Sequence, residues 1–232
     1  MIGAPHVHHR VTDSTNERAK QLARAGAPHG TLVTAHEQTA GRGRQGRAWS
    51  APPGKAVLMS VVLRGLEERH ELLPLVAAVA VCHACEQHAS PPCAIKWPND
   101  VWIRGHKLAG ILVEGRPQED WMVVGIGLNV AIDEDEFPEE LRDTATSLLI
   151  EGGAPPLSEL VDALAAQLGS WLDADPGEVL AAWRQRDALR GERVGWGHGE
   201  GSAAGIDDSG ALLVDTPDGR VALDASEVHL LR

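Results

Sequence analysis

Four short apolar segments between residues 94 and 130 are separated only by turns, and they constrain the fold more than any other feature. The segments are AIKW (94–97), VWI (101–103), KLAGILVE (107–114) and WMVVGIGLNV (121–130). Apolar, β-branched runs of this length, bounded by turn residues, are typical of sheet strands. Pro-Asn-Asp at 98–100 and Arg-Gly-His at 104–106 supply two of the turns. The middle of the chain is therefore predicted to be a β-sheet.

Helices and further strands surround this sheet. Residues 13–26, DSTNERAKQLARAG, predict a capped helix with an apolar face that ends at a glycine. A histidine-rich exposed strand is expected at the N-terminus. Further strands are predicted at 31–38 and 55–64, and helices at 72–88, 157–174 and 176–189. This mixture predicts the α/β (α+β) class.

The pattern of residues changes near residues 189–191. From there to the end, short strand-like segments are interrupted repeatedly by glycine. Such a pattern predicts a small antiparallel barrel of about five strands. We therefore predict two domains, residues 1–189 and residues 190–232.

The charge excludes one large class of function. The chain has 33 acidic and 21 basic residues, and its formal net charge is −12. A general nucleic-acid binder would present a basic face, so no nucleic-acid partner is expected. The N-terminus has no apolar run, and no stretch reaches the roughly 20 apolar residues of a membrane helix. We expect a soluble cytoplasmic protein with no membrane partner.

The chain has three cysteines, Cys82, Cys85 and Cys93. A small and odd number of cysteines does not suggest a disulfide framework. Helical spacing would bring His88 near the first two, so a zinc site is conceivable. The alternative is a buried, alanine-rich helix that carries small thiols, and the composition of this segment favours it.

Residues 41–46, GRGRQG, have the spacing of a dinucleotide-binding loop. That fingerprint requires a strand before the loop and a helix after it. Here Pro52, Pro53 and Gly54 follow, and they predict no helix. A phosphate-binding P-loop is excluded as well, because no Gly-Lys-Ser/Thr closes the motif.

The same region is basic in an acidic chain. Residues 41–55 contain Arg42, Arg44, Arg47 and Lys55 and no carboxylate. Glycine lets a backbone approach an anion while guanidinium groups bind it. A solvated basic loop is the simpler alternative. The absence of acids nevertheless favours a clamp for a polyphosphate or an adenylate.

A second polar cluster comprises Lys96, Asp100 and Lys107, which lie at turns between the predicted strands. An aspartate at a turn ordinarily caps the local backbone. Beside two lysines, Asp100 could equally hold Mg²⁺ or orient one of the lysines.

Glycines within the predicted strands mark places of close approach. Gly110 allows another backbone or a flat ligand to lie against its strand. Gly125 and Gly127 weaken a buried strand unless something needs the space. Asn129 points towards the same region.

Taken together, these segments resemble the biotin protein ligases. The resemblance rests on DSTN (13–16), EQTAGRGRQGRAWSAPPG (37–54), KWPNDV (96–101), KLAGILVE (107–114) and GIGLNV (125–130), in matching order and spacing. No single piece is specific, but GRGRxG followed by KWPND and KxxGIL is. The glycine-rich C-terminal part is similar to the small barrel of that family, so the resemblance covers nearly the whole chain.

The resemblance implies a fold and a reaction. The fold is a mixed β-sheet catalytic domain related to class II tRNA synthetases and lipoate ligases, followed by a small SH3-like barrel. Biotin and MgATP would give biotinyl-5′-AMP and pyrophosphate, and the biotinyl group would pass to one lysine of a biotin carboxyl carrier domain of acetyl-CoA carboxylase or a related carboxylase. A homodimer is compatible with the family. The DSTN motif begins at Asp13, leaving no room for a winged helix-turn-helix, so we expect a ligase without repressor activity.

The resemblance also implies roles for individual residues. The residues implied for biotin are Ser14, Thr15, Asn16, Gln38, Arg42, Gly43, Arg44, Lys107, Gly110 and Gly127. Those implied for ATP are Arg42, Arg44, Trp49, Lys96, Asn99, Asp100, Lys107 and Asn129. Catalysis would involve Arg44, Lys107, Asp100 and Lys96, with Mg²⁺ on the ATP phosphates and Asp100 as its candidate protein ligand. The nucleophile is the substrate's own carboxylate, so the enzyme must supply positioning and charge neutralisation.

Two alternatives stay open. A lipoate–protein ligase would use the same adenylation chemistry, although GRGRQG and KWPND favour biotin. A non-catalytic protein that binds biotin or an adenylate is the other alternative. The presence of Arg42, Arg44, Asp100 and Lys107 argues against it, and an assay of pyrophosphate release distinguishes the two.

Overall fold

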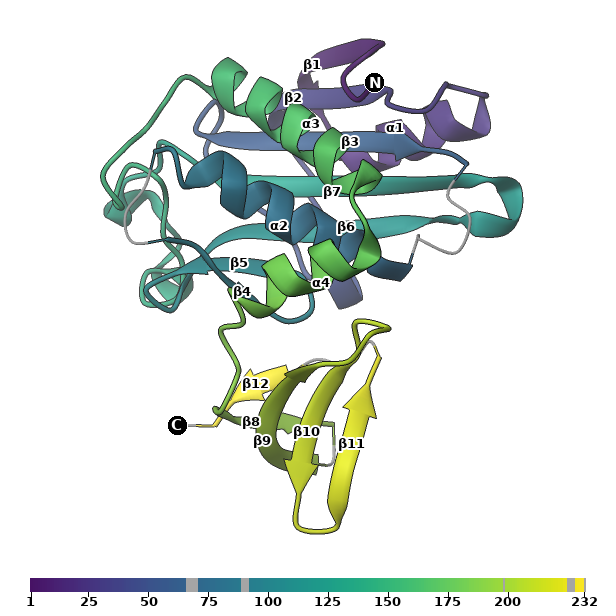
Figure 1. The fold of residues 1–232 in the computed structure, drawn as a ribbon. Coiled ribbons are helices and arrows are strands. Elements are labelled where there is room, and N and C mark those ends of the chain that lie inside the picture. Colours follow the sequence, from purple (N-terminus) through teal and green to yellow (C-terminus); the bar gives the residue numbers. More distant parts are fainter. Residues whose placement is uncertain (66–70, 89–91, 198, 225–227, 232) are drawn as a thin grey trace.

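The computed structural model describes residues 1–65, 71–88, 92–197, 199–224 and 228–231. Figure 1 shows a larger body built on one sheet and a smaller body built on a second sheet. The strands are β1 (His6–Thr12), β2 (Leu32–Gln38), β3 (Ala56–Leu63), β4 (Ala94–Lys96), β5 (Asp100–Ile103), β6 (His106–Arg116), β7 (Trp121–Asn129), β8 (Arg193–Trp196), β9 (Gly199–Ile206), β10 (Leu212–Thr216), β11 (Gly219–Leu223) and β12 (Val228–Leu230). The α-helices are α1 (Thr15–Arg24), α2 (Leu73–Cys85), α3 (Leu157–Asp173) and α4 (Pro176–Arg184). None of the helices in these ranges combines the length and apolarity needed to cross a membrane.

The larger sheet is mixed, as the sequence predicted. Its strand order is β1-β2-β3-β7-β6-β5-β4. Strands β1 and β2 are parallel because α1 makes the crossover between them, whereas the remaining neighbours are antiparallel. The four central segments of the sequence analysis therefore form one continuous run of neighbouring strands.

Helices cover both faces of this sheet. Successive residues of a strand point to opposite faces. Val62 and Val123 accordingly pack with α1, whereas their neighbours Val61 and Val124 belong to the core shared with α2, α3 and α4. In Figure 1, α2, α3 and α4 lie in front of the sheet and α1 lies behind it.

Helix α2 is buried on all sides, which explains its apolar, alanine-rich composition. Cys82 and Cys85 lie within it, Cys93 precedes β4, and all three thiols are free and buried. Within the ranges that the structure describes, no three His, Cys, Asp or Glu side chains come close enough together to hold a metal ion.

Helix α4 is shorter than predicted. The sequence predicted a helix to residue 189, but the helix ends at Arg184. The next residues pair with β4 instead, because the Ile95 amide donates to the Arg186 carbonyl at 2.6 Å and the Ala188 amide donates to the Ile95 carbonyl at 2.9 Å. Backbone pairing of residues 186–188 with β4 therefore prevails over the helical pattern of this segment.

The smaller sheet is antiparallel, with the order β11-β10-β9-β8-β12. Five strands and their antiparallel pairing agree with the prediction. The two bodies are in contact: the Trp97 indole donates from Nε1 to the Gly210 carbonyl at 3.0 Å, and Arg184 donates to the Ile206 carbonyl at 3.2 Å. The boundary at residues 189 and 190 stays a prediction.

Asp187 follows α4, where the chain passes from the larger body to the smaller one. Its carboxyl group is expected to make the free energy of unfolding fall as pH rises. Burial raises the pKa of its carboxyl group, and Oδ2 is buried with no hydrogen-bond partner among the described residues. A folded-state pKa above the unfolded value means that this group lowers stability as pH rises between the two values. Asp187→Asn should therefore gain stability relative to the parent between acidic and neutral pH. Thermal unfolding of both proteins at several pH values measures this difference.

Asp207→Asn is the matched control, because the Asp207 carboxyl group shifts in the opposite direction. Burial opposes its charge, but hydrogen bonds from Ser209, Ala211 and Gly210 outweigh burial and lower its pKa. Asp207 therefore contributes stability above the unfolded pKa that is lost as pH falls. The control should lose stability relative to the parent as pH rises. A pH-independent difference for Asp187→Asn would contradict the role given to that residue.

Candidate active site

A cavity of about 480 Å³ opens on the larger sheet. Its walls are the start of α1, the loop at 41–50, strands β3, β5, β6 and β7, and a segment near 137–145. Every residue that the family resemblance implied for the site lines it: Ser14, Thr15, Asn16, Gln38, Arg42, Gly43, Arg44, Trp49, Lys96, Asn99, Asp100, Lys107, Gly110, Gly127 and Asn129. Lys55, which the charge pattern placed in the same clamp, pairs with Glu136 outside the cavity lining. Five segments that are far apart in sequence thus meet in one place.

One end of the cavity is a neutral, hydrogen-bonded polar wall. The Thr15 amide donates to Gln38 Oε1 at 2.6 Å. The Ser60 hydroxyl donates to Asn16 Oδ1 at 2.6 Å, and Asn16 Nδ2 donates to Glu114 Oε2 at 3.0 Å. These bonds fix the orientation of the side chains, and such an end suits a neutral ligand edge with donors and acceptors.

Gly125 makes room for Asn16. Gly125 pairs with Ser60 on β3 and with Leu112 on β6, so its missing side chain leaves a slot between the neighbouring strands. A Cβ at Gly125 would overlap the Asn16 amide. The space that the sequence analysis assigned to an unknown occupant is therefore filled by Asn16.

Gly125→Ala should displace Asn16 and weaken the polar wall. Asn16 is held from two sides by Ser60 and Glu114, so it cannot move without losing hydrogen bonds. We expect a loss of about 1–3 kcal/mol in unfolding free energy, as for overpacking of a core. We also expect roughly tenfold weaker binding of biotin, the ligand that the sequence resemblance implies, since a change of about 1.4 kcal/mol is tenfold in affinity. Calorimetric titration with biotin and urea unfolding measure the two effects. Gly169→Ala in α3 is the control, because its Cβ meets only Ile2 at an ordinary 3.5 Å; equal behaviour of the two variants would contradict this account.

Two further glycines form a flat floor. Gly110 and Gly127 face each other in register on β6 and β7. The Trp49 indole lies on them: a Cβ on Gly127 would overlap the ring, and one on Gly110 would lie 3.0 Å from it. The group that lies against these glycines is the side chain of Trp49, and not the backbone or the flat ligand that the sequence suggested. Trp49 Nε1 is buried and has no hydrogen-bond partner among the described residues.

Charged groups gather at the other end of the cavity. Lys107 Nζ lies 2.7 Å from Asp100 Oδ1 and 5.8 Å from the centre of the Trp49 ring. Lys96 Nζ lies 5.2 Å from the centre of the Trp102 ring. Asp100 is therefore paired with a lysine, which is one of the alternatives that the sequence left open.

The basic loop is folded back on itself and anchored at both ends. The Trp49 amide donates to the Gly41 carbonyl at 2.9 Å, and the Gly43 amide donates to the Arg47 carbonyl at 2.7 Å. Arg44 NH1 donates to Asn99 Oδ1 at 3.2 Å. Arg42 turns to α1 instead, where its NH1 lies 2.7 Å from Glu17 Oε1. The two arginines thus contact different walls of the site.

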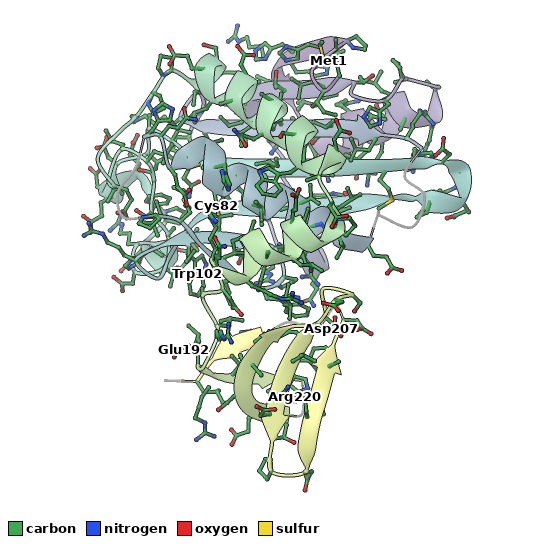
Figure 2. All side chains as sticks on the ribbon, viewed as in Figure 1. Met1, Cys82, Trp102, Glu192, Asp207 and Arg220 are labelled. Atoms are coloured by element: carbon green, nitrogen blue, oxygen red, sulfur yellow. The ribbon has the colours of Figure 1, made fainter. Side chains whose placement is uncertain are left out.

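One wall of the cavity and several hydrogen-bond partners were not predicted from the sequence. The segment at 144–146 pairs with the start of β6, since the Lys107 amide donates to the Thr144 carbonyl and the Thr146 amide donates to the Lys107 carbonyl. Asn129 Nδ2 donates to the Thr146 carbonyl at 2.9 Å, which ties β7 to the same segment. Trp102 and Leu230 also line the cavity, and Trp102 lies at the border of the larger body near the smaller sheet (Figure 2). The only local signal for Ser60 was a single hydroxyl within an apolar strand.

Comparison with known proteins shows which family has this sequence pattern and architecture. The model of the biotin/lipoate A/B protein ligase family matches residues 8–131, and that of the biotin protein ligase C terminal domain matches residues 198–231. The chain is 36% identical to the bifunctional ligase/repressor BirA of Bacillus subtilis, over 99% of this chain and 75% of that protein. It is 37% identical to the biotin–[acetyl-CoA-carboxylase] ligase of Mycobacterium tuberculosis, over 95% and 87%.

A solved structure agrees with these matches. The biotin protein ligase from Aquifex aeolicus in complex with biotin and ATP superimposes with a TM-score of 0.86 at 31% identity, and the match covers 99% of each chain. The fold, the cavity and the matched sequence all point to one group of proteins. The chain belongs to the biotin/lipoate A/B protein ligase family.

Proposed function

We propose that this chain is a biotin–protein ligase, which uses ATP to attach biotin to a lysine of the carrier domain of acetyl-CoA carboxylase or a related carboxylase. One observation carries the proposal: a single cavity joins a neutral polar wall to a cationic end formed by the basic loop and Lys107. Relatives named as biotin–[acetyl-CoA-carboxylase] ligases support it.

The reaction has two steps that this cavity suits. The biotin carboxylate attacks the α-phosphorus of ATP, biotinyl-5′-AMP forms, and pyrophosphate leaves. The amine of the carrier lysine then attacks the acyl carbon, an amide forms, and AMP leaves. Negative charge builds on the oxygens around the α-phosphorus in the first step. Lys107 and Arg44, which contact the neighbouring residues Asp100 and Asn99, would neutralise it.

The residues divide between the two ligands by chemistry. The neutral wall of Ser14, Thr15, Asn16 and Gln38 offers hydroxyl and amide partners to the ureido ring of biotin. Gly110 and Gly127 are assigned to the biotin side as well, and biotin would reach them only after the Trp49 indole that covers them has moved. The nucleotide side comprises Trp49, Lys96, Asn99, Asp100 and Asn129. Arg42, Gly43 and Arg44 belong to the loop over both ligands, and Lys107 serves the biotin carboxylate and the α-phosphate. Arg44, Lys96, Asp100 and Lys107 are the proposed catalytic residues.

Magnesium fits one group of this site. Asp100 Oδ1 is buried and, among the described residues, accepts no aligned hydrogen bond, although Lys107 lies 2.7 Å away. A carboxylate oxygen is the kind of ligand that Mg²⁺ prefers. Magnesium bound chiefly by the ATP phosphates, with Asp100 as its protein ligand, would supply further positive charge at the phosphates.

Lipoate is the competing substrate, because the matching family model covers lipoate as well as biotin ligases. The test incubates the protein and a carrier domain with ATP and either biotin or lipoate, followed by mass spectrometry of the carrier. A mass increase of one biotinyl group, and none with lipoate, is expected. Modification by lipoate alone, or by neither acid, would overturn the proposal.

The proposal extends to the domain organisation, the oligomeric state and the cellular location of the protein. Residues 1–189 would form the catalytic domain and residues 190–232 the small barrel, and a homodimer is compatible with this arrangement. The net charge of −12 supports a cytoplasmic protein that does not bind nucleic acid.

A further inference from the structure

Four charged side chains of alternating sign connect the basic loop to the polar wall of the cavity. Arg42 NH1 lies 2.7 Å from Glu17 Oε1, and the same oxygen lies 2.7 Å from Lys20 Nζ; both contacts are ion pairs and not aligned hydrogen bonds. Lys20 Nζ in turn lies 2.9 Å from Glu114 Oε1. Glu17 and Lys20 belong to α1, Glu114 belongs to β6, and Arg42 belongs to the loop, so three separate elements meet here.

The chain of contacts continues into the cavity. Glu114 uses its second oxygen, Oε2, to accept from Asn16 Nδ2 at 3.0 Å. Asn16 lines the cavity and is held by Ser60 from the other side. The position of the loop is therefore tied, through side chains in direct contact, to the wall that would receive the neutral end of the ligand.

Burial makes this cluster more than an ordinary surface network. The Lys20 side chain is only 11% exposed, and it lies between two carboxylates. Burial opposes the charge of Glu114, but hydrogen bonds from Asn16 and Lys20 outweigh burial and lower its pKa. Two acids beside a site for an anionic ligand would repel that ligand, whereas the two cations bring the net charge of the four side chains to zero.

Glu17 occupies the key position in the cluster. Lys20 has a carboxylate partner on each side, so the loss of Glu17 leaves it paired with Glu114. The loss of Glu17 removes the ion pair that attaches Arg42, and with it the loop, to α1. The closest contact of Arg42 with Glu17 is through NH1, and the Arg42 side chain is 55% exposed. Other nitrogens of the same group can still meet an anion in the cavity.

We propose that Glu17 is a positioning residue, which holds Arg42 and thereby keeps the loop at 41–48 closed over the cavity. Its consequence for the reaction rests on the proposed function: a closed loop retains biotinyl-5′-AMP, a reactive mixed anhydride, until the carrier lysine arrives. The closing contact itself does not depend on the identity of the ligand. The two arginines therefore have different tasks, since Arg42 attaches the loop to α1 and Arg44 attaches it to Asn99.

The first experiment measures closure of the loop with no ligand present. Trypsin binds an extended segment, so cleavage after Arg44 and Arg47 requires the Gly43–Arg47 and Gly41–Trp49 backbone hydrogen bonds to break, and the cleavage rate reports that open population. Glu17→Gln keeps the shape of the side chain and removes its charge, and it should accelerate cleavage roughly two- to fivefold, the range expected for loss of a partly exposed ion pair. Glu17→Asp, which keeps the charge, should restore part of the protection.

Glu119→Gln is the matched control, because it removes the charge from another carboxylate paired with an arginine, 2.6 Å from Arg116 and outside the cavity lining. It should leave loop cleavage unchanged. Thermal unfolding of each variant shows whether the fold is intact. Equal cleavage rates for the parent and a folded Glu17→Gln protein would overturn the proposal.

The second experiment asks whether Glu17 acts through Arg42. The dissociation rate of a non-hydrolysable biotinyl-AMP analogue is measured for the parent, Glu17→Gln, Arg42→Ala and the double variant. Glu17→Gln should accelerate dissociation severalfold in the parent but not in the Arg42→Ala background. Equal acceleration in both backgrounds would overturn the role assigned to Arg42. Failure of the parent to bind the analogue would count against the proposed function alone, since the cleavage experiment still tests the contact.

Discussion

Lys107→Ala is expected to lower the rate of biotinyl-5′-AMP formation by roughly 100- to 1000-fold, the effect typical of losing one group that stabilises charge in a transition state. The Lys107 ammonium lies beside the cavity, 2.7 Å from Asp100. Its removal takes positive charge from the reacting carboxylate and phosphate. It also leaves the Asp100 carboxylate unpaired next to the phosphates of ATP, which adds repulsion. The fold should survive, because Lys107 is a partly exposed residue at the start of β6.

Two further variants separate these causes. Lys107→Ala combined with Asp100→Asn removes the unpaired carboxylate, so any recovery over Lys107→Ala alone measures the repulsion. Lys55→Ala breaks a comparable ion pair with Glu136 outside the cavity lining and should have little effect on the reaction. Pyrophosphate release in single-turnover experiments gives the rates. Near-normal turnover of Lys107→Ala would mean that Lys107 is an ordinary surface lysine.

Arg44→Ala should release the intermediate roughly 10- to 100-fold faster than the parent. Ordering a loop costs about 1–2 kcal/mol per residue, so the net free energy that keeps this loop closed is small. A hydrogen bond to a charged group contributes about 1.5–3 kcal/mol, and every 1.4 kcal/mol changes an equilibrium tenfold. Arg44 contacts Asn99 at 3.2 Å, and we expect it to add charge-assisted contacts when the adenylate is present.

The phenotype should appear as loss of retention rather than loss of chemistry. The dissociation rate of biotinyl-AMP, or of a non-hydrolysable analogue, should rise more than the rate of adenylate formation falls. Escaped intermediate should also modify lysines on bystander proteins, which mass spectrometry detects. Arg44→Lys keeps the charge but loses the planar fork and should give an intermediate rate. Identical dissociation rates for Arg44→Ala and the parent would mean that Arg44 does not hold the loop closed.

Local sequence patterns were enough to predict most elements, whereas the family resemblance implied the residues that line the cavity. Strand β3 is buried along its whole length, as its apolar run indicated. The glycines of β7 do make room for other groups, as their presence in a buried strand required. Helix α4 is the exception: its helical pattern continues to residue 189, but backbone pairing with β4 ends the helix at Arg184. The roles assigned to individual site residues stay predictions.

What the sequence determined by itself was the set of elements, because periodicity, turn residues and glycine act over a few neighbouring positions. A specific combination of motifs also indicated which polar residues come together at the cavity. The occupants of the glycine spaces, Asn16 and Trp49, and the partners Ser60, Glu17 and Glu114 were decided only by the tertiary structure. The physical reason is the order of the sheet: β3 and β6 both flank β7, so Ser60 and Leu112 lie on either side of Gly125. Residues that are 44 and 98 positions from Asn16 thereby bind the same amide, and no local pattern encodes that distance.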